Sequence, residues 1–217
     1  AAPLLDKRLD TPGYAQGILF GKVDYVADGT GGLRVIDFVP DTSATELAFY
    51  STPGMALGIS RAETTVFIAD TSGLRVIDAR DTSNIKQVAV QESPAVPSKL
   101  NVVGDRLYLT DAYQGLRILD TINPLAPTLI GSMVTPGTAL DVAISGQFAY
   151  IADGPKGLRL VDVADFANPI EVNWFGQEDF SDYRAVAVDG ETAFVANGEF
   201  GLVAIIFAED PTQNQQY

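Results

Sequence analysis

The sequence predicts an all-β fold, and more narrowly a five-bladed β-propeller built from four-stranded antiparallel blades. Three observations lead to this prediction: a repeated unit, apolar segments of strand length without a sustained helical period, and one repeat that is split between the two ends of the chain. Units of roughly 40 to 45 residues with four strands each are typical of propeller blades arranged around a channel.

The repeated unit consists of an aromatic strand, a short turn and an arginine-containing strand. Its first copy is Tyr25-Val-Ala-Asp-Gly-Thr-Gly-Gly-Leu-Arg-Val-Ile-Asp37, and further copies begin at Phe67, Tyr108 and Tyr150. A fifth, more diverged copy begins at Phe194. The anchoring leucines are 41 to 44 residues apart, at Leu33, Leu74, Leu116, Leu158 and Leu202. Five such units account for nearly the whole chain.

Each unit has the pattern of four strands, as the fourth repeat illustrates. Its first strand is expected over 139–145, and a Gly-containing turn leads to a second strand over 149–152. The third strand, 158–162, is almost continuously apolar, as expected for a strand covered on both faces. A Pro-containing connection precedes a more polar fourth strand over 170–175, which is expected at the outer edge.

The two ends of the chain together make one complete repeat. Residues 3–13 align with 127–137, a fourth strand that leads into the next first strand, and the last repeat stops after its third strand near Phe207. The N-terminal strand is therefore expected to complete the last blade and close a ring, which removes an exposed sheet edge. A solenoid would instead need terminal caps. The prediction is one domain over 1–217, with 208–217 a polar tail.

Composition excludes several classes of chemistry. The 217 residues contain no His and no Cys, so Ser-His-Asp and Cys-His nucleophiles, zinc sites of the usual N/S type and disulfides are excluded. No cofactor is predicted. With 14 Lys and Arg against 28 Asp and Glu, the net charge of −14 disfavours nucleic acid and anionic lipid as partners. Cations and basic protein surfaces are the expected partners.

Hydropathy and the first residues of the chain indicate the cellular location of the protein. No apolar run approaches the roughly 18 residues of a membrane helix, so membrane insertion is not expected. The small residues Ala1-Ala2-Pro3 are typical of the stretch left after a signal peptide is removed, although a trimmed chain would look the same. A secreted, periplasmic or cell-surface location is therefore expected.

The repeated pattern resembles the LVIVD-repeat family of bacterial and archaeal surface-associated β-propellers. The resemblance covers residues 3–207 and is carried by the Tyr-Val-Ala-Asp-Gly turn followed by Gly-Leu-Arg-Ile-Ile-Asp-like strands. It is weaker in the fifth repeat, where Asn197, Val203 and Ile206 replace the first Asp, the Arg and the last Asp. The resemblance implies a propeller exposed at or outside the cell envelope, and it implies no catalytic residues.

Two series of repeated charged residues are interpreted as structural. The carboxylate that ends each second strand is expected to accept a backbone N–H in an Asx turn, at Asp28, Asp70, Asp111 and Asp153, with Asn197 in the fifth repeat. A ring of these carboxylates that binds Ca²⁺ is the alternative, but blade symmetry separates them, so no metal site is predicted. The arginines are expected to pair with a carboxylate of the same or the next blade, at Arg34, Arg75, Arg117 and Arg159.

An enzyme is disfavoured by the residues expected around the channel mouth. Positions aligned in the first strands of the blades are heterogeneous: Gln16, Gly58, Lys99, Asp141 and Ala185. Glycosidic cleavage needs an acid and a second carboxylate, and here Asp141 is the single carboxylate, with Lys99 expected to neutralise it.

The connection over 176–183 is about two residues longer than its counterpart over 134–139 and mixes acids with aromatics. Such a surface suits a basic partner or the face of a sugar. Tyrosines on comparable connections extend it. The predicted partner-binding residues are Trp174, Glu178, Asp179, Phe180, Asp182, Tyr183, Tyr14 and Tyr113. An alternative is that Phe180 and Tyr183 pack onto the blades and the acids are only solvated.

The function predicted first is a non-catalytic, exported propeller that binds a protein partner or acts as an assembly module. Two alternatives stay open. One is a carbohydrate-active enzyme or lectin, which would bring two or three carboxylates within roughly 5 to 10 Å of one another. The other is a structural subunit of a surface layer, filament or envelope complex, which would bury a large contact area on its outer strands or tail.

Overall fold

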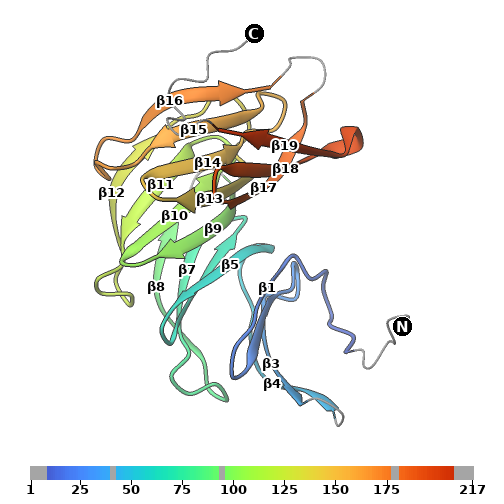
Figure 1. Cartoon of the computed structure of the whole chain (residues 1–217). Coiled ribbons are helices and arrows are strands. Elements are labelled where there is room, and N and C mark those ends of the chain that lie inside the picture. The colour runs from blue at the N-terminus through green and yellow to red at the C-terminus, as the bar shows by residue number, and fades with distance from the viewer. Residues whose placement is uncertain (1–8, 40–42, 93–95, 177–180, 208–217) are drawn as a thin grey trace. The chain divides into compact units, whose positions relative to one another are not determined.

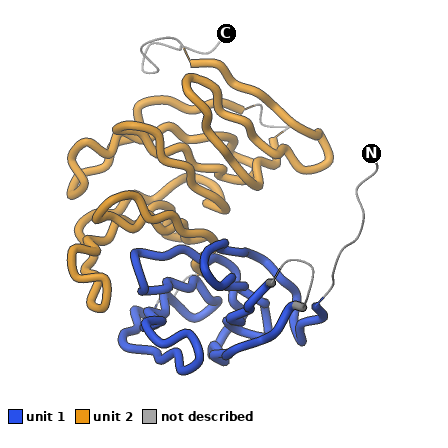
Figure 2. The backbone as a smooth tube through the Cα atoms, turned by 60° about the horizontal axis from the view of Figure 1, so that its bottom comes forward, with its two compact units in different colours: residues 1–94 blue, residues 95–217 orange. Residues whose placement is uncertain are grey.

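The computed structural model describes residues 9–39, 43–92, 96–176 and 181–207, and they are almost entirely β-structure (Figure 1). The chain divides into two compact units, residues 1–94 and residues 95–217 (Figure 2). The first unit holds strands β1 to β8, and the second holds β9 to β19. The prediction of one domain over 1–217 stays a prediction.

The described residues form five antiparallel sheets, each made by one sequence repeat. The first unit contains β1 (Gly17–Leu19), β2 (Asp24–Ala27), β3 (Leu33–Val39) and β4 (Ser43–Tyr50), then β5 (Ala56–Ala62), β6 (Thr65–Asp70), β7 (Gly73–Asp78) and β8 (Lys86–Glu92). The second unit contains β9 (Pro97–Val103), β10 (Arg106–Asp111), β11 (Gly115–Asp120) and β12 (Thr128–Met133), then β13 (Asp141–Ser145), β14 (Phe148–Ala152), β15 (Leu158–Asp162) and β16 (Ile170–Phe175). The fifth sheet contains β17 (Tyr183–Asp189), β18 (Thr192–Asn197) and β19 (Leu202–Ile206), with the 3₁₀ turn η1 (Gly198–Phe200) before β19.

The five blades predicted from the repeat are therefore present as sheets, four of them with four strands. Consecutive strands are neighbours in every sheet, as expected for a meander. Third strands such as β15 are buried, and fourth strands such as β16 are mostly exposed. Within the second unit β13 contacts both β9 and β17, and within the first unit β1 contacts β5. First strands of successive blades thus lie side by side, as the innermost strands of propeller blades do.

The expected closing strand and tail fall largely outside the described residues, which begin at Leu9 and end at Phe207. In the described part of the chain, the fifth sheet has three strands, and β19 pairs with β18 alone. Five blades are seen, and the closed ring is not.

The core of each unit lies between neighbouring blades. In the first unit, side chains of the first two blades share one cluster that includes Leu33, Ile68 and Ile77. In the second unit, one cluster joins the third and fourth blades around Tyr108 and Ile151, and another joins the fourth and fifth. Each blade buries its apolar residues against the next, which is why the repeats are stable only in the company of their neighbours.

Candidate functional site

The turns between second and third strands lie beside the entrances to the first strands of the following blades. In the first unit Gly29 and Ala56 exchange two backbone hydrogen bonds, at 3.1 and 2.9 Å. In the second unit Gly154 and Tyr183 do the same, at 3.1 and 3.0 Å. We call the surface formed by these turns and entrances, in each unit taken by itself, the loop face of that unit. These isolated bridges connect the backbones of neighbouring blades, although each blade forms a separate sheet.

The buried aspartates of the first and fourth blades hold the entrance segments in place. Asp153 accepts hydrogen bonds from the Thr135 hydroxyl at 2.6 Å and from the Gly137 N–H at 2.9 Å. In the first blade Asp28 accepts the same pair from Thr11 and Gly13, at 2.6 and 2.9 Å. The segment Thr-Pro-Gly therefore works as a clip at 11–13 and 135–137, whereas at 52–54 the Thr52 hydroxyl donates to the Gly54 carbonyl instead. Asp153 and Asp28 are wholly buried and face the protein.

The Asx turns expected at these positions occur in two other blades. Asp70 accepts the Ser72 N–H at 2.7 Å, and Asp111 accepts the Tyr113 N–H at 3.1 Å. At Asp28 and Asp153 the clip contacts replace the expected turn. Asn197 accepts the Asp182 N–H at 2.7 Å in the fifth blade. These side chains fix backbone rather than present oxygen to solvent.

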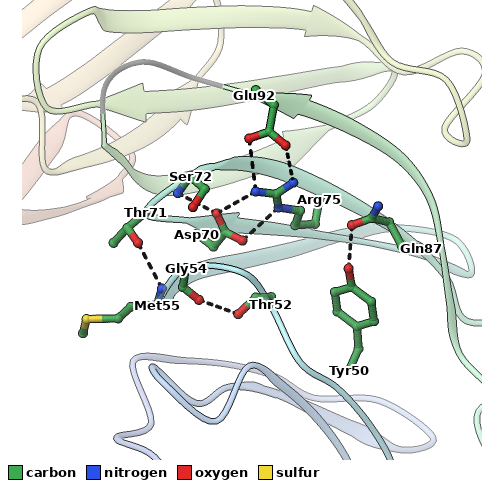
Figure 3. Close-up of polar contacts among 10 residues, drawn as sticks. All are labelled: Tyr50, Thr52, Gly54, Met55, Asp70, Thr71, Ser72, Arg75, Gln87 and Glu92. Carbon is green, nitrogen blue, oxygen red and sulfur yellow. Dashed lines mark hydrogen bonds and ion pairs between the residues drawn. The ribbon is translucent and has the colours of Figure 1, made fainter.

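Three of the four repeated arginines, Arg34, Arg75 and Arg159, pair with carboxylates of their own blade rather than of the next. Arg75 lies between Asp70 and Glu92, with nitrogen to oxygen distances of 2.8 Å to each (Figure 3). Equivalent pairs are Arg34 with Asp28 and Glu46, and Arg159 with Asp153 and Glu171. These side chains are nearly buried, so pairing offsets the cost of removing them from water.

The strand register corrects one of the aligned channel-mouth positions. Asp141 lies opposite Ala152, and the residue opposite the matching Ala27 is Gly17, not Gln16. Gln16 instead donates its N–H to the Ala27 carbonyl, as Leu140 does to Ala152. The other aligned positions agree with the register, because each lies opposite, or hydrogen-bonds to, the counterpart of Ala152 in its own blade. Gly58 lies opposite Ala69, and Ala185 lies opposite Ala196. The backbone of Lys99 hydrogen-bonds to the hydroxyl of Thr110.

Asp141 uses both carboxylate oxygens to hold backbone. One accepts the Val142 N–H at 2.9 Å, and the other accepts the Val186 N–H of β17 at 3.0 Å. Burial raises the pKa of this carboxyl above its ordinary value, against the opposing effects of the two N–H groups and the Lys99 charge. Asp141 therefore links the first strands of the fourth and fifth blades.

We expect Asp141 to make the second unit relatively more stable at acidic pH. A carboxyl with a raised folded-state pKa binds a proton more readily in the folded chain, so its contribution is full below the unfolded-state pKa and is lost as the pH rises through the folded-state pKa. The free energy of unfolding of the wild type minus that of Asp141→Asn should increase when urea unfolding is measured at pH 4.5 instead of pH 7. An identical difference at both pH values would contradict this assignment.

The residues predicted to bind a partner occupy several different environments. Tyr14 in the first unit and Tyr113 in the second are 78% and 75% exposed. Trp174 is 37% exposed, and Asp182 pairs with Arg184 at 2.8 Å. Glu178, Asp179 and Phe180 lie outside the described residues.

Tyr183 is a core residue rather than a surface one. It is 3% exposed, packs with Tyr150 and Val186, and occupies the bridge position that Ala56 holds in the second blade. The alternative in which it packs onto the blades is therefore correct. Alignment of Tyr183 with the buried Ala56 was the signal that sequence reasoning missed.

Two of the repeated arginines also contact an aromatic residue of the fourth strand, a contact that was not predicted from the sequence. Trp174 lies opposite Arg159, with the guanidinium 5.2 Å from the ring centroid, and Phe49 lies opposite Arg34 at 5.0 Å. Both rings cover a paired arginine from the solvent side and leave part of their own surface exposed. Trp174 is thus anchored, which suits a rigid contact residue.

No metal centre was found among the described residues, where no three Asp or Glu side chains form a group able to hold an ion. Nor does any helix in that part of the chain have the length and apolarity needed to cross a membrane.

Five sheets, each built by one repeat, define a repeat protein with a β-propeller-like fold. A family model described as the LVIVD repeat matches residues 12–52, 98–135 and 136–175, which is more than half of the chain. The chain belongs to the LVIVD-repeat family. The second and fifth repeats lie outside the matched ranges and are supported by their own sequences and sheets.

Two computationally designed proteins of known structure have a similar fold. The Ika4 protein superimposes with a TM-score of 0.61 at 7% identity, over 74% of this chain and 96% of Ika4. The Ika8 protein gives a TM-score of 0.68 at 10% identity, over 93% of this chain but 60% of Ika8. At such identities the likeness shows the fold alone. No curated protein matches the sequence.

Proposed function

We propose that this protein is a non-catalytic binding module that recognises a protein partner through its loop face. The observation that carries the proposal is that Tyr113 is largely exposed on a fixed backbone. Its own N–H and that of Gln114 are held by Asp111 at 3.1 and 3.2 Å. Tyr14 is similarly exposed, between the clip residue Gly13 and the braced turn at Gly29. An aromatic side chain on an ordered backbone loses little entropy on binding, which favours a contact anchor.

The partner's surface is proposed to be basic. The chain carries a net charge of −14, so electrostatic steering favours a positively charged protein. A catalytic role is not proposed, because both oxygens of Asp141 accept backbone hydrogen bonds and neither is offered to a substrate. A glycan partner would use the same exposed aromatics, and the experiment below separates it from a protein.

The test places a photo-crosslinking amino acid at Tyr113, Tyr14 or Ile122 of the full chain in its native source. Ile122 is an exposed apolar residue at the opposite end of β11 and serves as the matched control. Tyr113 and Tyr14 are each expected to capture a protein, in a yield that falls as salt rises, and Ile122 is not. Equal capture at Ile122, or protein capture at none of the three with retention on immobilised glycans, would overturn the proposal.

The location is proposed to be outside the cytoplasm, as the family resemblance implies. Protease added to intact cells of the native source should then cleave the protein, or should do so once an outer membrane is permeabilised. Cleavage that requires lysis of the inner membrane would refute export.

We further propose that the N-terminal segment completes the fifth sheet. Support comes from Thr11 and Gly13, which make the same contacts as Thr135 and Gly137, in agreement with the alignment of 11–13 with 135–137. Residues 4–9 then correspond to β12, a strand that pairs with the third strand of its blade. Among the described third strands, β19 is the one without a fourth-strand neighbour.

The register of β12 makes this closure testable. Ser132 lies opposite Arg117, so the corresponding pair is Arg8 and Val203. The chain has no cysteine, and Arg8→Cys combined with Val203→Cys is expected to form an intramolecular disulfide on mild oxidation. Arg8→Cys with Val188→Cys is the mismatched control. A disulfide between two chains would indicate strand exchange, and no disulfide would refute closure.

A further inference from the structure

The third blade departs from the arrangement that neutralises the repeated arginines. In the first, second and fourth blades, Arg34, Arg75 and Arg159 each contact two carboxylates. Arg117 occupies the same place in β11, yet within the described chain it contacts no carboxylate at ion-pair distance. Asp111 is the residue of the third blade that corresponds to Asp70 and Asp153. One of its carboxylate oxygens accepts the N–H groups of the following turn.

The register shows which residues the third blade lacks. Glu46 and Glu171 lie opposite Ile36 and Val161, and the residue opposite the equivalent Leu119 is Leu129. The second blade has Gln87 at this place, but its arginine pairs instead with Glu92, which lies opposite Gly73. The aromatic cover is lost as well. Ser132 lies opposite Arg117, where Phe49 and Trp174 lie opposite their arginines and Val90 lies opposite Arg75 in the second blade. Both substitutions are in β12, so the change is confined to one outer strand.

The consequence is a partly accessible cation on a strand of the blade. Arg117 is half-buried, whereas Arg34, Arg75 and Arg159 are buried, and Leu129 beside it is 47% exposed. A partly desolvated guanidinium without a counter-charge gains from any carboxylate that can reach it, and it takes such a group in a bidentate manner. The other blades show the distance that is preferred, 2.8 to 3.4 Å from nitrogen to carboxylate oxygen.

We propose that Arg117, Leu129 and Ser132 form a docking site for an acidic segment of another protein. A carboxylate of that segment takes the place of the missing glutamate, and an apolar part of the segment covers Leu129. Charge complementarity identifies the occupant, because the half-buried Arg117 has no carboxylate at ion-pair distance in the described chain and therefore favours an acidic group over a basic one. This site goes beyond the loop face, since it is formed by a third and a fourth strand and selects the opposite charge.

The test uses the full chain with arginine labelled at Nε and a hexaglutamate peptide as the probe. Titration is expected to shift the Nε–H signal of Arg117 saturably, as read by NMR. Arg117→Gln should abolish saturable binding. Leu129→Glu supplies a carboxylate in the place of Glu171 and should weaken probe binding by about tenfold or more, since a charge-assisted contact is then already satisfied. Arg184→Gln removes an exposed arginine elsewhere in the same unit and should leave probe binding unchanged.

Several outcomes would overturn the proposal. One is a probe that shifts no Arg117 signal. Another is Leu129→Glu binding the probe as tightly as the wild type does. Loss of stability in Arg117→Gln with no change in probe binding would mean that the arginine is only structural. Self-association of the wild type that is lost in Arg117→Gln would identify a second copy of this chain, rather than another protein, as the occupant.

Discussion

Replacing Asp153 with alanine is expected to lower the free energy of unfolding of the second unit by about 3–5 kcal/mol, the usual cost of removing one partner of a buried ion pair. Asp153 is wholly buried and contacts three residues: Thr135 and Gly137 of the entrance segment, and Arg159 of β15. Without it, the Thr135 hydroxyl and the Gly137 N–H lose this acceptor, and the buried Arg159 guanidinium loses one of its two carboxylates.

Urea unfolding monitored by the fluorescence of Trp174, the single tryptophan of the chain, reports on this unit. The control is Asp165→Ala, which removes an exposed turn carboxylate that accepts the Ala167 N–H, and about 1 kcal/mol or less is expected there. A loss at Asp153 no larger than the loss at Asp165 would show that the buried contacts contribute little.

Repetition made the blades predictable from the sequence. Five copies of one pattern specify five sheets at once, and a continuous apolar third strand such as β15 has no other environment than a buried one. The polar β16 was placed at the edge for the same reason. The pattern of apolar and polar side chains therefore predicts which strand of a blade is inner and which is outer, because each face of a strand contacts either a neighbouring blade or water.

The details that failed depend on contacts that a repeat alignment does not contain. The one-residue shift from Gln16 to Gly17 arose because no turn of fixed length marks the start of β1, whereas pairing with Ala27 does. The acidic neighbours of Tyr183 favour a partner-binding residue, and the sequence leaves packing onto the blades as the alternative. The bridge of Tyr183 to Gly154 turns the side chain into the core instead.

Partner choice for the arginines was likewise undetermined by the sequence. From the sequence alone, a carboxylate of the same blade and one of the next blade are equally able to neutralise the arginine. The bulge between the third and fourth strands, seen between Leu160 and Val161, brings Glu171 and Trp174 to the same arginine. Strand register and the position of the bulge determine such contacts, and neither can be predicted from the residue types alone.

The Thr-Pro-Gly clip leads to the second large effect: Gly137→Ala is expected to destabilise the second unit by about 2–4 kcal/mol, an overpacking cost at the upper end of the usual range. An added Cβ would lie 2.2 Å from the Asp153 carbonyl oxygen and 2.8 Å from its carboxylate. Neither atom can retreat, because the carbonyl accepts backbone N–H groups of the turn and the carboxylate holds Thr135 and Arg159.

Gly146→Ala separates this close approach from the ordinary cost of replacing a glycine. Gly146 has a φ of +57° in a turn, and an added Cβ there meets nothing within 4 Å, so only backbone strain of about 1 kcal/mol is expected. Gly13→Ala places a Cβ 1.8 Å from the Asp28 carbonyl oxygen and should destabilise the first unit in parallel. Hydrogen exchange resolved by residue would then show the loss in β2 and β3 for Gly13→Ala, and in β14 and β15 for Gly137→Ala. If Gly137→Ala cost no more than Gly146→Ala, the clip would not be what requires glycine at this position, and its recurrence in two blades would need a different physical cause.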